Sequence, residues 1–167
     1  VEILNFAQVR NNELVEANPV FQNRGDGHFE IIAEWGLGSL RSGRGMSMAD
    51  LDGDGDLDIV VNNLRAAAQL FENQLCGGSS LQIDLLWPES GNTQSIGATL
   101  ILSTNRGRYY RDVKAASGYI SGDPARIHFG FPQYEDIQSL EIQWPDGTIS
   151  IVEELPGNTV VKVTRVG

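Results

Sequence analysis

Residues 50–58 read Asp-Leu-Asp-Gly-Asp-Gly-Asp-Leu-Asp, which places five carboxylates within nine residues. Carboxylates this close repel one another unless a cation neutralises them. Calcium takes about six to eight oxygen ligands, and a loop with acids at positions 1, 3, 5 and 9 can curl around the ion. Asp50, Asp52, Asp54 and Asp58 occupy these four positions. The spacing therefore predicts a calcium-binding loop, and the alternative interpretation is a turn of solvated aspartates.

The two middle positions of the loop agree with this interpretation. Gly55 falls at position 6, where a sharp turn is required, and Asp56 at position 7 would offer its backbone carbonyl while its side chain faces solvent. Magnesium demands a tighter octahedral shell with retained waters, and zinc favours histidine and cysteine. We therefore expect calcium (Ca2+) as the cofactor, in a structural role, with the ligands Asp50, Asp52, Asp54, Asp56 and Asp58.

The sequence after the loop argues against an EF-hand. An EF-hand needs a bidentate glutamate at position 12, and Val61 stands there. An EF-hand also needs flanking helices, whereas Ile59-Val60-Val61 is a β-branched run that favours a strand. The loop is therefore expected to lead into a strand.

The rest of the chain predicts an all-β fold. Nineteen glycines and six prolines are scattered through the chain, and its short apolar runs have strand length. Turns with a clear mechanism are expected at 24–27 and at 144–148, where glycine or proline sets the backbone. The expected strands are 20–23, 28–35, 45–49, 58–63, 69–72, 81–87, 98–103, 109–114, 126–131, 140–144, 150–154 and 160–164.

A glycine-rich and serine-rich stretch at 75–80 marks the expected domain boundary, near residue 76. Residues 1–75, which hold the acidic loop, and residues 76–167 would then form two β domains. About a dozen short strands at near-regular spacing are typical of a β-sandwich, a barrel or a piece of a propeller.

The charge of the chain restricts its partners. Twenty-two acidic residues stand against twelve basic ones, so the formal net charge is −10. Such a surface repels nucleic acid and anionic membranes, so nucleic-acid binding is not expected. No apolar run approaches the roughly 20 residues needed to span a bilayer, so membrane insertion is not expected either. The chain begins at Val1, so either a leader was removed or the chain is an excised piece, and its single cysteine, Cys76, fixes no disulfide.

Several motifs resemble known families. The first half is similar to the FG-GAP/VCBS repeats of integrin-type propellers, through residues 23–29, 43–45, the loop at 50–58 and residues 60–63. The second half resembles the ASPIC/UnbV domain that follows such repeats in the cartilage acidic protein family, through residues 96–98, 117–121, 126–130 and 144–148. The resemblance implies an extracellular, periplasmic or cell-surface binding protein with no catalytic residues to transfer.

The resemblance also implies a fold for each half of the chain. Residues 1–75 would be a propeller-blade-like calcium repeat, packed on or linked to a β-sandwich or barrel-like domain at 76–167. Because one blade cannot bury both faces of its sheet and a propeller needs about four to eight blades, the rest of a propeller or self-association is also expected.

Two functions remain open at this point. The favoured one is a non-catalytic calcium-binding module that mediates adhesion by binding a protein or a carbohydrate. The other is an accessory or catalytic domain of a secreted hydrolase, with Asp123 and His128 beside a pocket. A pocket that joins His128 to an acid and to Ser117 or Ser121 would favour the hydrolase. A flat or ridged polar surface would favour binding.

Overall fold

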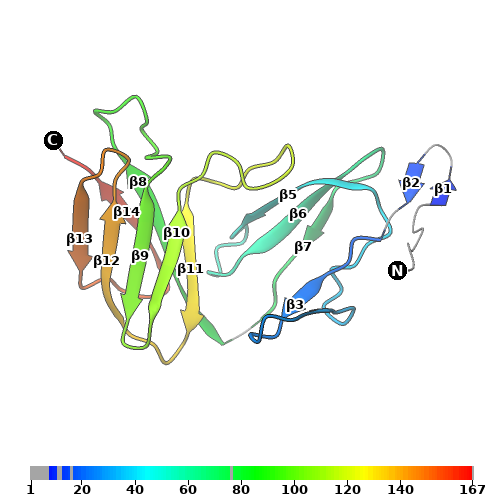
Figure 1. The fold of residues 1–167 in the computed structure, drawn as a ribbon, viewed down its shortest axis with the longest axis horizontal. Coiled ribbons are helices and arrows are strands. Elements are labelled where there is room, and N and C mark those ends of the chain that lie inside the picture. Colours follow the sequence, from blue (N-terminus) through cyan, green and yellow to red (C-terminus); the bar gives the residue numbers. More distant parts are fainter. Residues whose placement is uncertain (1–7, 11–12, 16, 76, 167) are drawn as a thin grey trace.

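The computed structural model describes residues 8–166 apart from residues 11, 12, 16 and 76 (Figure 1). Every regular element in the described residues is a β-strand, which confirms the all-β prediction. The strands are β1 Gln8–Arg10, β2 Glu13–Val15, β3 Phe21–Asn23, β4 Phe29–Ile31, β5 Gly43–Ala49, β6 Asp58–Asn63, β7 Gln69–Phe71, β8 Gly78–Leu86, β9 Thr99–Thr104, β10 Arg108–Asp112, β11 Ile127–Pro132, β12 Ile137–Gln143, β13 Ile149–Glu153 and β14 Thr159–Thr164.

Each strand expected from the sequence overlaps one of these elements, with three differences. The hairpin β1–β2 lies in a stretch where no strand was expected. β4 ends at Ile31, before the expected residue 35, because the chain turns there and Gly36 adopts a positive φ of 69°. β8 begins at Gly78, inside the stretch taken for a linker, because Gly78 and Ser79 pair with β11.

The strands β1 to β7 form small antiparallel sheets, and this part of the chain is called the first unit. β3 and β4 form a hairpin, and β5, β6 and β7 form a three-stranded sheet in that order. The acidic loop connects β5 to β6, whose register pairs Ala49 with Asp58. Among the described residues, every buried apolar side chain lies between Leu81 and Trp144, so this unit has no buried apolar core of its own. Its exposed large apolar side chains include Phe21, Phe29, Ile31, Trp35, Met46 and Leu70.

The strands β8 to β14 form a two-sheet sandwich, which is called the second unit. One sheet has the order β10-β9-β12-β13, and the other has the order β11-β8-β14, with β14 parallel to β8. Side chains from both sheets meet in one core, which includes Leu81, Phe129, Leu100 and Ile142. The described strands form no closed barrel, so the sandwich form of the prediction holds. Residue 76, the expected boundary, lies outside the described residues.

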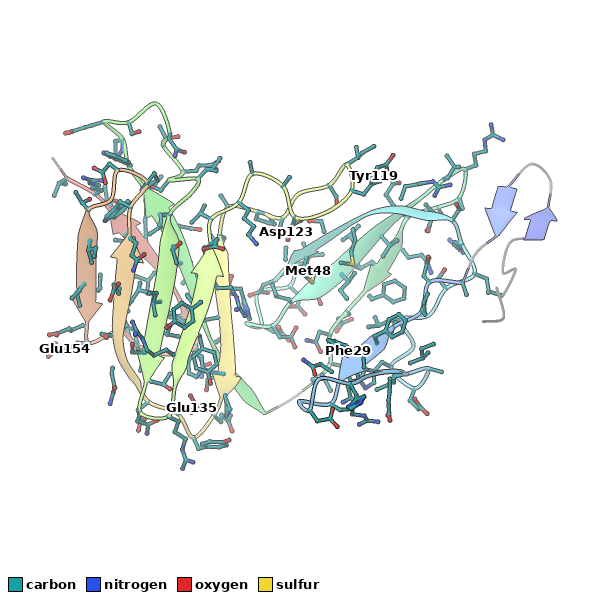
Figure 2. The ribbon with its side chains drawn as sticks, in the orientation of Figure 1. Phe29, Met48, Tyr119, Asp123, Glu135 and Glu154 are labelled. Carbon is teal, nitrogen blue, oxygen red and sulfur yellow. The ribbon has the colours of Figure 1, made fainter. Side chains whose placement is uncertain are left out.

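The two units are in direct contact. The connection between β10 and β11 reaches across to β5, as Figure 1 shows. There the Met48 amide donates to Asp123 Oδ1 at 2.7 Å, and Ser47 Oγ donates to the Gly122 carbonyl at 3.1 Å. Figure 2 shows Met48 and Asp123 close to each other where the two units meet. Because β5 is an edge strand, this contact gives its free amide a partner.

Arg165, which follows the last strand β14, packs against two tryptophan rings. The Arg165 guanidinium lies 4.0 Å from the ring centre of Trp87 and 5.2 Å from that of Trp144. It also donates to Asp146 Oδ2 at 2.7 Å. This hydrogen bond, with others from Thr148, holds the pKa of Asp146 well below its ordinary value of 3.8.

We expect this pair to give the sandwich an acid-dependent stability. Because the pKa of Asp146 is lowered in the folded state, its contribution is present above pH 3.8 and is lost as the pH falls below that value. Asp146→Asn should therefore lose less stability than the wild type between about pH 5 and about pH 3, measured by urea denaturation. Glu89→Gln, an exposed substitution of the same charge change, is the control. Equal losses in Asp146→Asn and wild type would contradict the assignment.

Candidate metal centre

The acidic loop is wound by its own aspartates. Asp50 Oδ1 accepts a hydrogen bond from the Gly53 amide at 2.7 Å, and Asp50 Oδ2 accepts one from the Gly55 amide at 3.1 Å. Further along, Asp52 Oδ1 accepts from the Asp54 amide at 3.2 Å. Gly53 and Gly55 have φ values of 82° and 100°, which residues other than glycine rarely adopt. The sequence therefore curls because glycines permit the turns and carboxylates hold them.

This winding brings three predicted ligands together. One carboxylate oxygen from each of Asp50, Asp52 and Asp54 lies within 4.8 Å of the others. Asp50 is half-buried, while Asp52 and Asp54 are exposed. Three hard, anionic oxygens converging at the mouth of a loop are the donor set that calcium prefers.

Asp58 has a different environment from these three residues. Its side chain is only 3% exposed, Oδ2 accepts from the Leu51 amide at 3.0 Å, and Oδ1 accepts from the Asn73 amide at 2.9 Å. This carboxylate therefore ties the start of the loop to the end of β7. Its role as a metal ligand stays a prediction, whereas its role as a backbone acceptor was not foreseen from the sequence.

Asp56 corrects one expectation. Its side chain was expected to face solvent, but the residue is half-buried, and its Oδ1 atom is shielded from solvent without a hydrogen-bond partner. Burial raises the pKa of Asp56, and the neighbouring carboxylates, Asp54 foremost, raise it further. A shielded carboxylate oxygen without a donor is costly in its charged form, and a nearby cation would offset that cost. The residues present therefore fit a calcium ion.

The second unit closes one side of the loop. Gln82 Nε2 donates to Asp50 Oδ2, and His128 Nε2 lies 2.8 Å from the Gly55 carbonyl oxygen. A Cβ at Gly55 would lie 2.7 Å from Ser80 Oγ, so the two units approach as closely as a glycine allows. Sequence reasoning missed Gln82. The available signal was an amide inside the apolar run that begins at Leu81.

The residues of the hydrolase hypothesis are not brought together. Ser117, Ser121 and Asp123 line a cavity of about 660 Å³ against the β5–β6 sheet. His128 lines a different cavity, of about 470 Å³, whose acids are Asp50 and Asp84. Asp123 also uses Oδ1 to accept the Met48 amide. The discriminating arrangement of histidine, acid and serine in one pocket is therefore absent from the described residues.

Fold and site together define a class of protein: an all-β chain in which an acidic loop joins two strands of a small sheet and contacts a β-sandwich. Comparison with known families agrees with this description. Residues 7–61 match the model of an FG-GAP-like repeat, and residues 88–166 match the model described as ASPIC and UnbV. These matches confirm both resemblances drawn from the sequence motifs.

Three relatives share the name cartilage acidic protein 1. The frog protein, from Xenopus tropicalis, is 30% identical over 111 residues, which are 64% of this chain and 17% of the relative. The mouse protein is 30% identical over 110 residues, which are 63% of this chain and 17% of the relative. The human protein is 29% identical over 110 residues, which are 63% of this chain and 16% of the relative. The chain thus matches about a sixth of the length of these relatives.

The different environments of the loop acids predict different effects on stability without metal. Asp58→Ala should lower the free energy of unfolding by about 1–3 kcal/mol in the presence of chelator, because it strands two backbone donors. Asp52→Ala, the matched control, removes a repulsive charge and one exposed hydrogen bond, whose amide donor water can satisfy, so it should change the free energy of unfolding little. Urea denaturation with chelator measures both. Equal losses in the two variants would show that Asp58 has no special structural role.

Proposed function

We propose that this chain is a non-catalytic, calcium-binding module of an extracytoplasmic protein, and that it presents a binding surface to a protein or a carbohydrate. The observation that carries the proposal is the convergence of the carboxylates of Asp50, Asp52 and Asp54. The same loop also holds the shielded, partnerless Oδ1 atom of Asp56. Both features concentrate negative charge in the loop, and a bound cation would offset it.

Calcium is the cation that suits this loop best. The donors of the loop are oxygens only, and on this proposal Asp58 and the Asp56 carbonyl join the three convergent carboxylates. Bound calcium would supply the positive charge that offsets their repulsion and would stiffen the connection between β5 and β6. Sites of this kind in extracellular modules bind with dissociation constants of about 10⁻⁴–10⁻³ M, which suits permanent occupancy outside a cell.

The location outside the cytoplasm has two supports. The FG-GAP-like match spans residues 7–61 and so includes the whole acidic loop, and the matched relatives carry a name that refers to cartilage. On these two grounds we place the chain in an extracellular, periplasmic or cell-surface protein.

None of the residues that the structure describes forms a helix long and apolar enough to cross a membrane.

The binding role is supported by unfilled apolar surface on the first unit. The cavity of about 660 Å³ is lined by Met46, Met48, Ile59 and Phe71 on the sheet and by Phe21 on the neighbouring hairpin. An exposed apolar surface of this kind marks an interaction site. Its occupant on this proposal is a protein surface, either another β-sheet of a larger propeller or a second copy of the chain. The net charge of −10 excludes nucleic acid from the proposal.

Thermal unfolding tests the calcium site directly. Because a ligand that binds only the folded state stabilises it by RT ln(1 + [L]/Kd), calcium at about 100 times its Kd should add about 2.7 kcal/mol and raise the melting temperature. Magnesium at the same concentration should raise it less. Asp54→Ala should remove most of the calcium-dependent rise.

The control for this experiment is Asp26→Ala, which removes an exposed acid from the hairpin tip outside the loop. It should keep the full response to calcium. If calcium, magnesium and chelator give the same melting temperature for the wild type, the loop is a solvated turn and the proposed function loses its basis.

A further inference from the structure

The second unit holds the metal loop at several successive points. The Met48 amide, just before the loop, donates to Asp123. The first acid of the loop, Asp50, accepts from Gln82, and the Gly55 carbonyl in the middle contacts His128. The segment from β5 to the middle of the loop is therefore oriented by residues that lie far away in the sequence.

The two carboxylate oxygens of Asp50 accept different numbers of hydrogen bonds. A carboxylate offers about four lone pairs, two on each oxygen. Oδ2 accepts from Gln82 Nε2 and from the Gly55 amide, so both of its lone pairs are used. Oδ1 accepts from the Gly53 amide and keeps one lone pair. This pattern leaves a single oxygen of Asp50 for a cation.

The surroundings of Gln82 favour its hydrogen bond to Asp50. Its side chain is 5% exposed, and it lies on β8 between Leu81 and Ile83, both fully buried. A buried amide is costly unless it is hydrogen-bonded, and a charged acceptor makes the strongest such bond. Gln82 is also the register partner of His128 on β11, so the two side chains leave the same face of one sheet toward the loop.

We propose that Gln82 is a positioning residue of the calcium site, supplied by the second unit. Its amide occupies Asp50 Oδ2 and thereby presents Oδ1 alone to the ion. The affinity of the loop for calcium then depends on the docking of the sandwich, which makes the metal site a property of both units. This inference rests on the proposed function and adds to it a residue that lies between the two family matches.

The test is calcium titration of the full chain by isothermal calorimetry, well below the melting temperature. Gln82→Met keeps the length of the side chain and removes its donor. Because loss of a residue that orients a metal ligand weakens metal affinity by about 10–100-fold, Gln82→Met should raise the Kd for calcium at least about tenfold. Gln143→Met, the same substitution on β12 in the other sheet, is the matched control and should leave the Kd unchanged.

Three outcomes are distinguishable. If the wild type binds calcium and Gln82→Met shows a raised Kd while Gln143→Met does not, the positioning role stands. If the wild type binds calcium and Gln82→Met keeps the wild-type Kd, the positioning role is overturned while the calcium site survives. If the wild type binds no calcium, the proposed function fails, and the positioning role fails with it.

A stability control separates positioning from packing. A merely structural role for Gln82 would lower the melting temperature in chelator and leave the Kd of the folded protein unmoved. Should Gln82→Met fail to fold, as judged by tryptophan fluorescence, Gln82→Asn is the second variant. It retains an amide that is one methylene too short to reach Asp50, and it should weaken calcium binding to a similar extent. An unchanged Kd in Gln82→Asn would overturn the proposal.

Discussion

The mutual repulsion of five carboxylates between Asp50 and Asp58 is the constraint on which this structure depends. Two unit charges about 4 Å apart interact by about 1 kcal/mol in water and by more where protein excludes water. The described ion pairs all join other residues, so the direct contacts of the loop acids are with amide groups. Arg126, which is paired with Asp84, attracts Asp50 only from a longer distance. Amide donors hold the carboxylates of Asp50, Asp52, Asp54 and Asp58 in place and leave the net negative charge of the loop intact.

The hydrogen bonds between the loop acids and amide groups also contribute to the stability of the first unit. The β5–β6–β7 sheet buries no apolar side chain fully, so little of its stability can come from a hydrophobic core. Its order instead depends on polar contacts: Asp58 joins the loop to the end of β7, and Asp123 covers the edge of β5. The sandwich has its own core and can serve as the rigid partner.

Local patterns predicted much of the fold and of the site. The β-branched run after the loop predicted β6 to its exact ends, and Pro145 with Gly147 predicted the turn in which Gly147 has a φ of 86°. What could not be predicted depends on distant partners. Asp58 gained a backbone donor 15 residues away at Asn73, and Gln82 found its acceptor 32 residues away at Asp50. No periodicity encodes such contacts.

The same long-range contacts bear on the chemistry of a cation site. Affinity for calcium depends on the number of ligand charges and on the rigidity of the site. The loop supplies charge locally through its aspartates, whereas rigidity comes from β8 and β11, which hold Asp50 and Gly55. By thermodynamic linkage, any factor by which docking of the sandwich strengthens cation binding is also the factor by which the cation strengthens docking. A cation bound in this loop would therefore stabilise the contact between the two units, because its ligands lie in the first unit and the residues that orient them lie in the second.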